Sequence, residues 1–160
     1  MSDAIPSSTI SEVPVKRRRR TPCVGICSTT YGDLVCRGCR RFAHEIVQWN
    51  GYDMDQREQI WQRLEHQRDA VVGQLLMVEV PNDFAAIALH AQLDHLQGNE
   101  AKLAVLGYLV KQEWPLHKAG LRLTVRDAAL HAPLEAMRAL EEEMYERACA
   151  VYERNFKVSP

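Results

Sequence analysis

The sequence predicts a mostly α-helical protein in which an N-terminal four-cysteine metal knuckle with a helical hairpin is followed by a small helical bundle. Three observations lead to this fold class. Four of the five cysteines fall within 17 residues, hydrophobic residues recur with helical spacing after them, and Gly, Pro and Asn separate the periodic segments. A chain of 160 residues has room for such a module and a helical domain.

The first 22 residues form a basic segment with little hydrophobic content. They carry five basic and two acidic side chains. The basic run comprises Lys16, Arg17, Arg18, Arg19 and Arg20. Because this composition cannot bury enough apolar surface to fold, residues 1–22 are predicted to be a disordered basic arm. The run is either a solvated tail or a phosphate-contacting arm for RNA or DNA, and no aromatic residue within it suggests base stacking.

The cysteines Cys23, Cys27, Cys36 and Cys39 form two closely spaced pairs. Pairs only a few residues apart bring thiolates together at low entropic cost, so these four side chains are predicted to bind one metal centre. The spacing fits either Zn²⁺ or an iron–sulfur cluster. A redox dithiol at Cys36 and Cys39 is the alternative, but no βαβ pattern surrounds it. A helix that begins near Cys39 would stabilise its thiolate through the helix dipole.

Two helices are predicted directly after the cysteine segment. The first covers residues 39–49, with an apolar face that repeats every three to four residues and a left-handed end at Gly51. The second covers residues 54–77 and carries an apolar stripe opposite charged residues. Asp53 is the expected N-cap of this second helix, and Gln56 completes a capping box.

Three further helices are expected in the second half of the chain. They cover residues 84–97, 100–113 and 126–156, and the middle one is apolar on most sides and should be central and buried. Residues 121–124 are predicted as a turn or a short strand. Pro133 falls inside the last helix, where it marks either the true first turn or a kink.

The expected organisation is a metal-binding module at residues 23–80 and an α-helical domain at residues 81–160, after the arm. The net charge of −1 argues against a whole molecule that binds nucleic acid electrostatically. No apolar run approaches the roughly 20 residues that a membrane helix needs, and the N-terminus lacks the pattern of a secretory signal. We therefore expect a cytoplasmic protein without membrane contact, in which the thiols stay reduced.

Several histidines are weaker candidates for chemistry. His44 follows the cysteines by about one helical turn and is either a group supporting the metal ligands or, as we favour, a surface histidine. His90 and Asp94 are four residues apart, and His95 follows. They could form half of a metal or acid–base site, but a polar edge beside an apolar stripe is the simpler interpretation.

The remaining residues of note have structural interpretations. The glutamates at 141–143 with Glu146 are expected to form a solvated helix face. Cys149 is expected to be a buried thiol, and three tryptophans are expected to anchor the core. These are Trp49, Trp61 and Trp114. No glycine-rich phosphate loop or nucleophile elbow is present, so the sequence gives no positive support for catalysis.

A resemblance to a known family is carried by three short segments. They are Thr21-Pro-Cys-Val-Gly-Ile-Cys27, Cys36-Arg-Gly-Cys39-Arg40 and Glu45-Ile-Val-Gln-Trp-Asn50. Over residues 21–72 the chain resembles the bacterial domain-of-unknown-function family 1289, whose members are described as YdhL-type predicted iron–sulfur proteins. The resemblance implies a four-cysteine metal module without an established activity, and it implies nothing for residues 81–160.

The predicted function is therefore a non-catalytic metal-binding interaction module that holds zinc or an iron–sulfur cluster. It would contact RNA or DNA through residues 16–20 and a protein partner through the C-terminal helices. The main alternative is an iron–sulfur electron-transfer or redox-sensing protein. A third hypothesis is an enzyme whose site lies near His90, Asp94 and His95.

Overall fold

The structure is a computed structural model that describes residues 21–125 and 128–156. The basic run and nearly all of the predicted arm lie outside these residues. The α-helices are α1 (Ala43–Val47), α2 (Met54–Leu75), α3 (Pro81–His90), α4 (Gly98–Gln112) and α5 (Pro133–Phe156). The strands are β1 (Leu76–Val78), β2 (Leu121–Val125) and β3 (Ala128–Leu130). Short 3₁₀ turns are η1 (Ser28–Tyr31), η2 (Trp49–Gly51) and η3 (Leu116–Ala119).

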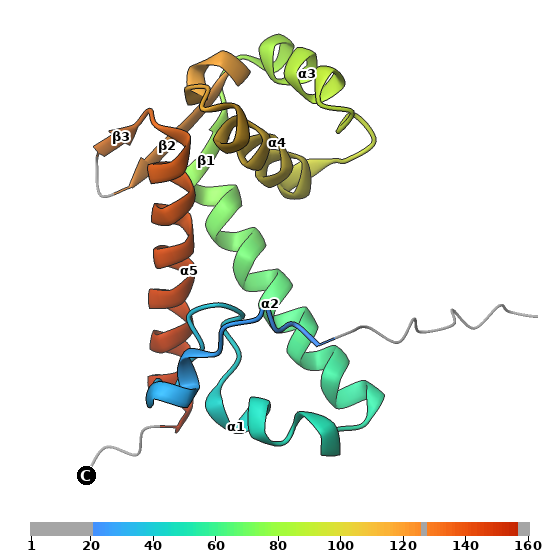
Figure 1. The fold of residues 1–160 in the computed structure, drawn as a ribbon, viewed down its shortest axis with the longest axis vertical. Coiled ribbons are helices and arrows are strands. Elements are labelled where there is room, and N and C mark those ends of the chain that lie inside the picture. The colour runs from blue at the N-terminus through green and yellow to red at the C-terminus, as the bar shows by residue number, and fades with distance from the viewer. Residues whose placement is uncertain (1–20, 126–127, 157–160) are drawn as a thin grey trace, which may run out of the picture.

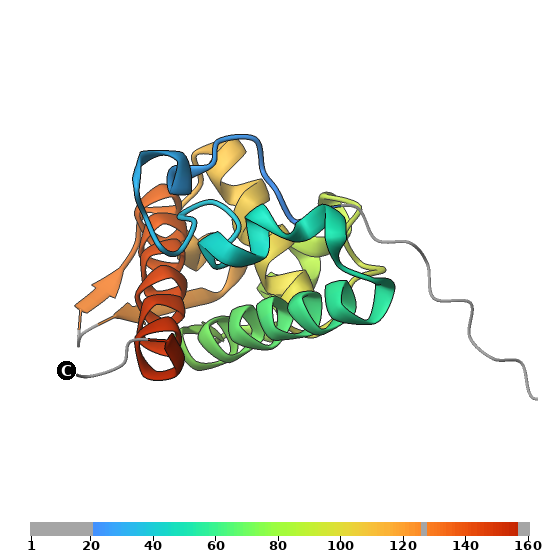
Figure 2. The ribbon, with the colours of Figure 1, turned by 90° about the horizontal axis from the view of Figure 1, so that it is seen from below.

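The two long helices, α2 and α5, pack against each other and form the body of the molecule (Figure 1). The sheet, α3 and α4 lie at one end of this pair, whereas the cysteine segment and α1 lie at the other end. The perpendicular view also shows the cysteine segment and α1 together beside the helix pair (Figure 2). None of the described helices is long and apolar enough to cross a membrane.

A small antiparallel sheet replaces part of the predicted helical bundle. Its order is β1-β2-β3, and the register pairs Leu76 with Leu123 and Leu123 with Leu130. The last turn of the helix expected at 54–77 is thus a strand, and the strand alternative for residues 121–124 is confirmed. Strand β1 has only three residues and pairs with residues almost 50 positions away. So short a strand shows no periodic pattern of its own in the sequence, which explains why the end of the helix was predicted wrongly.

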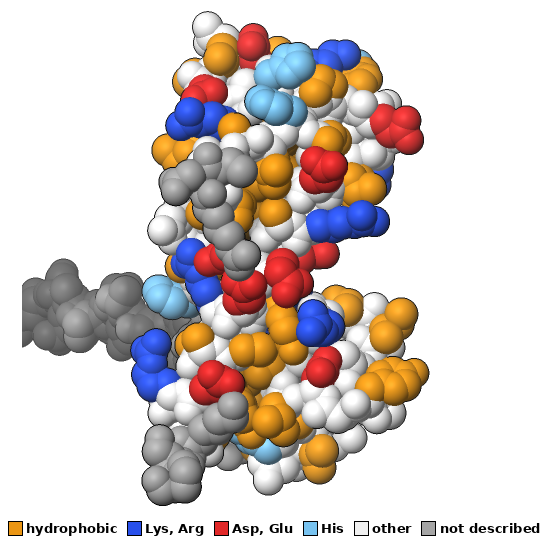
Figure 3. Space-filling view, turned by 90° about the vertical axis from the view of Figure 1, so that its left-hand side faces the viewer, with side chains coloured by type: hydrophobic (Ala, Val, Ile, Leu, Met, Phe, Trp, Pro, Cys, Tyr) orange, Lys and Arg blue, Asp and Glu red, His pale blue; other side chains and the backbone are white. Residues whose placement is uncertain are grey.

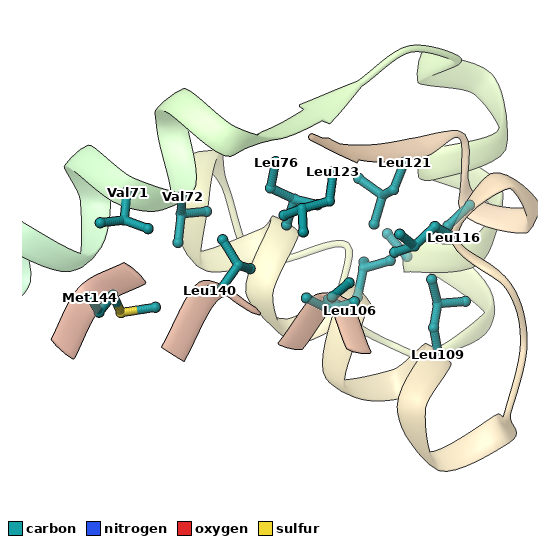
Figure 4. Packing of buried hydrophobic residues seen from close by; sticks show 14 residues of the cluster. Val71, Val72, Leu76, Leu106, Leu109, Leu116, Leu121, Leu123, Leu140 and Met144 are labelled. Carbon is teal, nitrogen blue, oxygen red and sulfur yellow. The ribbon is translucent and has the colours of Figure 1, made fainter. Parts of the chain in front are cut away.

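The main hydrophobic core lies where α2 meets the sheet, α4 and α5 (Figure 4). Its largest fully buried side chains include Leu76, Leu106, Leu109, Leu123 and Leu140. Burying each leucine contributes roughly 1.5–3 kcal/mol. Residues of α2 and of the segment after residue 80 share this core, and α4 is its central helix, as the apolar pattern predicted.

The start of α2 agrees with the prediction from the sequence, whereas the structure of the segment before it differs from the prediction. Asp53 accepts from the Gln56 backbone N–H at 2.8 Å, and the Gln56 side chain accepts from Asp53 N–H at 2.9 Å, so the capping box is confirmed. The preceding helix, expected from residue 39, begins only at Ala43. Gly51 lies in a 3₁₀ turn and does not adopt the left-handed conformation that was predicted for it.

The number of helices in the C-terminal half agrees with the prediction from the sequence, whereas the residues at which they begin and end differ from it. Helix α3 begins at Pro81, whose missing N–H costs nothing in a first turn, and it ends at His90 rather than at residue 97. Helix α5 begins at Pro133, which confirms that this proline marks a first turn. The expected start at residue 126 is wrong because β3 occupies the chain just before it.

Candidate metal centre

The second cysteine pair lies in a tight loop whose two ends are paired. Val35 and Phe42 form an isolated antiparallel bridge, and Cys36 N–H donates to the carbonyl of Arg41 at 2.9 Å. Within the loop, Arg40 N–H donates to the carbonyl of Cys36 at 2.8 Å. Arg40 adopts a left-handed φ of 60° there, which is uncommon for a residue with a side chain. This closed loop occupies the positions where the predicted helix would have begun, so a helix dipole does not act on Cys39.

Backbone N–H groups, rather than a helix dipole, stabilise a thiolate in this loop. The Sγ of Cys36 is buried, and burial alone would raise its pKa. Hydrogen bonds from the backbone of Cys39, Ser28 and Gly38 outweigh the effect of burial, and the pKa of Cys36 falls to about 7. A thiol with such a pKa is about half ionised at pH 7, far more than an ordinary thiol, and the thiolate is the form that binds metal ions.

The first cysteine pair lies in a loop that crosses directly over Gly38. A Cβ at Gly38 would come within 2.6 Å of Val24 Cγ2 and 3.3 Å of the Ile26 carbonyl oxygen. The contact is also held by Arg37 N–H, which donates to Ser28 Oγ at 2.9 Å. Glycine therefore permits an approach of the two loops that a side chain would block.

Three of the four predicted ligands come close together in this arrangement. Cys27, Cys36 and Cys39 lie near one another, whereas Cys23 is exposed at the start of the described chain. Cys27 Sγ is 2.9 Å from Thr29 Oγ1. Within residues 21–125 and 128–156, no three Cys, His, Asp or Glu side chains already have the geometry that holds a metal ion. The four-ligand site thus stays a prediction, and it requires Cys23 to close onto the other three.

A buried arginine contacts the sulfur of Cys39. Arg41 is 3% exposed, and its Nε donates to Cys39 Sγ at 3.3 Å. The guanidinium carbon lies 4.7 Å from the ring centroid of Trp49, which is itself buried. Burial raises the pKa of Cys39, and the hydrogen bonds and charge of Arg41 act in the opposite direction.

The chemistry of Arg41 fits an anionic centre at the cysteines. Among the described residues no carboxylate forms an ion pair with this guanidinium, although a buried cation is costly unless negative charge lies beside it. The group that contacts this guanidinium and can supply that charge as a thiolate is Cys39. A centre of four thiolates with a divalent ion would carry about two negative charges, so the residues present fit a metal at this position.

The other two arginines of the loop tie it to α5. Arg37 lies 3.8 Å from a Glu142 carboxylate oxygen, and its guanidinium sits 4.2 Å from the ring centroid of Tyr145. Arg40 donates to the Glu141 carbonyl at 3.3 Å and to the Gly38 carbonyl at 2.7 Å. These contacts fix the loop against the long helix rather than leave it free.

The structure does not bring the histidine candidates to this centre. His44 is half-buried and packs on the rings of Phe42 and Phe156. His90 is exposed and stacks on Trp114 with ring centroids 6.2 Å apart. Because α3 ends at His90, Asp94 and His95 do not continue its helical face, so the helical i, i+4 spacing on which the alternative of a metal or acid–base site depended is absent.

The other residues singled out from the sequence differ in how deeply they are buried. Cys149 was expected to be a buried thiol; it is partly buried, packs against a small hydrophobic cluster and hydrogen-bonds to Tyr145. Trp49 is buried, whereas Trp61 and Trp114 are partly exposed. Glu141, Glu142 and Glu146 are exposed and Glu143 is partly buried. Acidic side chains gather near the middle of the face that Figure 3 shows.

Sequence reasoning did not single out Arg41 from the other arginines of the loop. It also missed the buried ion pair between Glu45 and Arg63, which lies behind the cysteine loop. The available signal for that pair was a glutamate on the apolar face of a short helix. No sequence periodicity identifies its partner, because the two residues belong to different helices.

Comparison with known proteins gives one match. Residues 21–68 match the family model described as "Protein of unknown function (DUF1289)". No curated protein and no solved structure matches the chain. The matched segment includes all four clustered cysteines, α1 and most of α2, which confirms the family resemblance drawn from the sequence and leaves the C-terminal half outside it.

Proposed function

We propose that residues 21–53 form a metal-binding module in which Cys23, Cys27, Cys36 and Cys39 hold one zinc ion or one iron–sulfur cluster. The observation that carries this proposal is the buried guanidinium of Arg41, which contacts Cys39 Sγ and forms no ion pair with a carboxylate of residues 21–125 or 128–156. A metal–thiolate centre supplies the negative charge that this cation requires.

The module's own residues have separable roles in this proposal. Cys36 and Cys39 sit in the preorganised loop, and backbone N–H groups lower the pKa of Cys36 and so favour its thiolate. Cys23 and Cys27 come from the loop that crosses over Gly38. The metal would bind all four sulfurs and so link the first loop to the second. This link would stabilise the segment, because the hydrophobic cluster beside it is small.

Elemental analysis of protein purified without oxygen tests the proposal. We expect one zinc, or the iron and sulfide of one cluster, per chain. Replacing any one of the four clustered cysteines with Ser should lower this content. Cys149→Ser is the matched control, because Cys149 lies on α5 outside the two loops, and it should leave the metal content unchanged. Full-length protein that contains neither zinc nor iron when isolated anaerobically contradicts the proposal.

An iron–sulfur redox protein is the second candidate, and the contact between Arg41 and Cys39 favours it. Hydrogen bonds and positive charge at a ligand sulfur raise the reduction potential of a cluster. A cluster gives a coloured protein that bleaches on reduction, whereas zinc gives a colourless one. For a cluster, Arg41→Gln should lower the reduction potential, and a potential equal to that of the unchanged protein would exclude this role for Arg41.

An interaction role is supported by apolar side chains on the module. Val24, Ile26, Tyr31 and Val47 are each 70% or more exposed. Side chains of this size gain free energy when a partner removes them from water. We therefore place the protein partner on the cysteine module in addition to the C-terminal helices that the sequence suggested.

Nucleic-acid contact by residues 16–20 remains part of the proposal and lies outside the described residues. Such contact should weaken steeply with salt, because cationic side chains release counterions from phosphates. Replacing the five cations with Gln should abolish binding to an oligonucleotide. Equal binding by that variant would remove the arm from the proposal.

A further inference from the structure

A pocket of about 340 Å³ lies between the two cysteine loops and the two long helices. Its walls include Val24 and Arg40 from the loops, Leu64 from α2 and Met144 from α5. Met144 lies at one end of the main core (Figure 4). The volume is within the range of sites for small molecules, roughly 300–1,000 Å³. We call this space the loop pocket.

The surface of the loop pocket is mostly apolar. Val24, Leu64 and Met144 contribute aliphatic and thioether groups, and Trp61 adds an aromatic ring. Val24 is 70% exposed and Leu64 is partly exposed, and neither belongs to the main core. An apolar molecule in the pocket would remove both side chains from water, which favours binding.

The guanidinium of Arg40, on the wall of this pocket, has incomplete bonding. Its Nη1 donates to the Gly38 carbonyl at 2.7 Å, and its Nη2 donates to the Glu141 carbonyl at 3.3 Å. Its Nε is shielded from solvent and has no hydrogen-bond partner in residues 21–125 and 128–156. No carboxylate in those two ranges forms an ion pair with this half-buried cation. A shielded donor without an acceptor and a half-buried cation without an anion both cost free energy.

We infer that the loop pocket binds a small carboxylic acid with an apolar body. The carboxylate would supply the acceptor that Nε of Arg40 lacks and the negative charge that its guanidinium lacks. The hydrocarbon would lie against Leu64 and Met144, which leaves the polar contact at Arg40 to fix the orientation of the ligand. This site goes beyond the proposed metal centre, and it does not depend on that centre.

The other charged groups beside the pocket are already engaged. Arg68 lines the pocket and forms an ion pair of its own, and Glu65 also has an interaction in the structure. Cys39 lines the pocket as well, and its sulfur accepts from Arg41. The positive charge of Arg40 is therefore the feature that selects an anionic ligand over a neutral one.

NMR of isotope-labelled methionine methyl groups tests the inference in the full chain, with octanoate as the probe. Octanoate should shift the Met144 signal, assigned with Met144→Leu, and leave the signal of Met77 on β1 unmoved. Hexanoate should bind about tenfold more weakly, because it buries two methylene groups fewer. Octanamide, which keeps the chain without the charge, should also bind about tenfold more weakly. Equal affinities for octanoate and octanamide overturn the inference.

A variant that fills the pocket provides the second test. Leu64→Trp puts a larger side chain on the wall and should abolish octanoate binding. Leu134→Trp is the matched control, because Leu134 is 47% exposed on α5 and does not line the pocket. Arg40→Gln should weaken octanoate binding about tenfold and leave octanamide binding unchanged. If Arg40→Gln does not fold, the two tryptophan variants decide, and equal octanoate affinities for them overturn the inference.

Other occupants of the pocket would give different results. A second copy of the chain would make the Met144 signal depend on protein concentration without octanoate. Another segment of the same chain in the pocket would leave this signal unmoved at every octanoate concentration. Either result overturns the inference. Metal analysis of the same samples keeps the two proposals apart, because protein without metal that still binds octanoate contradicts only the proposed function.

Discussion

Glu45 and Arg63 form an ion pair that joins α1 to α2, with Nη2 of Arg63 2.6 Å from Oε2 of Glu45. The Glu45 side chain is 9% exposed and that of Arg63 is 25% exposed, so water screens the pair weakly. The same Oε2 accepts from Phe42 N–H at 2.9 Å, and the guanidinium lies 4.1 Å from the Phe42 ring centroid. This pair therefore holds the chain immediately after the cysteine loop.

Removing one partner of the pair should destabilise the protein strongly. Glu45→Ala leaves the Arg63 cation partly buried without its carboxylate, and we expect a loss of about 3 kcal/mol in the free energy of unfolding. Adding Arg63→Met should restore part of the loss, because it removes the unpaired charge. Urea unfolding measures both effects. Glu141→Ala, at an exposed site on α5, is the control and should cost about 0.5 kcal/mol or less; an equal cost for the two alanine variants would contradict the role of the pair.

Gly38 should be sensitive to a single added methyl group. Gly38→Ala places a Cβ 2.6 Å from Val24 Cγ2 and 3.3 Å from the Ile26 carbonyl oxygen, so the Val24 side chain must turn and the close approach of the two loops is disturbed. We expect a stability loss of about 1–3 kcal/mol and a lower metal content. Gly51→Ala is the control, since no atom lies within 4 Å of a Cβ there. Thermal unfolding with elemental analysis compares the two variants, and identical behaviour would show that the loops do not need this close approach.

The capping box at the start of α2 should contribute measurably to stability. Asp53→Ala removes the acceptor for the Gln56 N–H and should cost about 1 kcal/mol. Asp53→Asn keeps an acceptor oxygen and should cost less than the alanine change. Denaturant unfolding provides the comparison. Equal costs for the two variants would mean that the charge of Asp53 matters rather than its hydrogen bond.

Metal removal should loosen the cysteine segment and leave the main core folded. The buried residues of the main core all lie between Val71 and Met144, outside the cysteine loops. After chelation, amides in residues 21–42 should exchange with deuterium faster, whereas those in α4 and α5 should keep their protection. Hydrogen-exchange mass spectrometry resolves these segments. Uniform loss of protection would show that the centre supports the entire fold.

The metal-free protein should become more stable between pH 7 and pH 9. The pKa of Cys36 is lowered from 9.0 to about 7 in the folded state, so over this interval the unfolded chain binds the extra proton. Stability therefore rises with pH by roughly 2 kcal/mol across this interval, and this gain is lost as pH falls through 7. Above pH 9 the raised pKa of Cys39 acts in the opposite direction. Urea unfolding at several pH values measures the rise. Metal-free Cys36→Ser should lack the rise, and the same slope in that variant would assign the rise to other groups.

Several features were predictable from the sequence because they depend on residues close together in the chain. The capping box needs only Asp53 and Gln56, and Pro133 starts α5 because a proline fits a first helical turn. The apolar pattern of α4 identified the central helix. The cysteine spacing identified the loops, although their geometry could not be derived from it.

Only the tertiary structure decided the features that depend on residues far apart in sequence. The strand at Leu76 exists because it pairs with Leu123, and the carboxylate of Glu45 is buried because Arg63 meets it from another helix. Arg41 is distinguished from its neighbours by burial against Trp49 and Cys39. Spacing and caps determine local structure through nearby hydrogen bonds, whereas burial and charge pairing arise only when distant segments pack together.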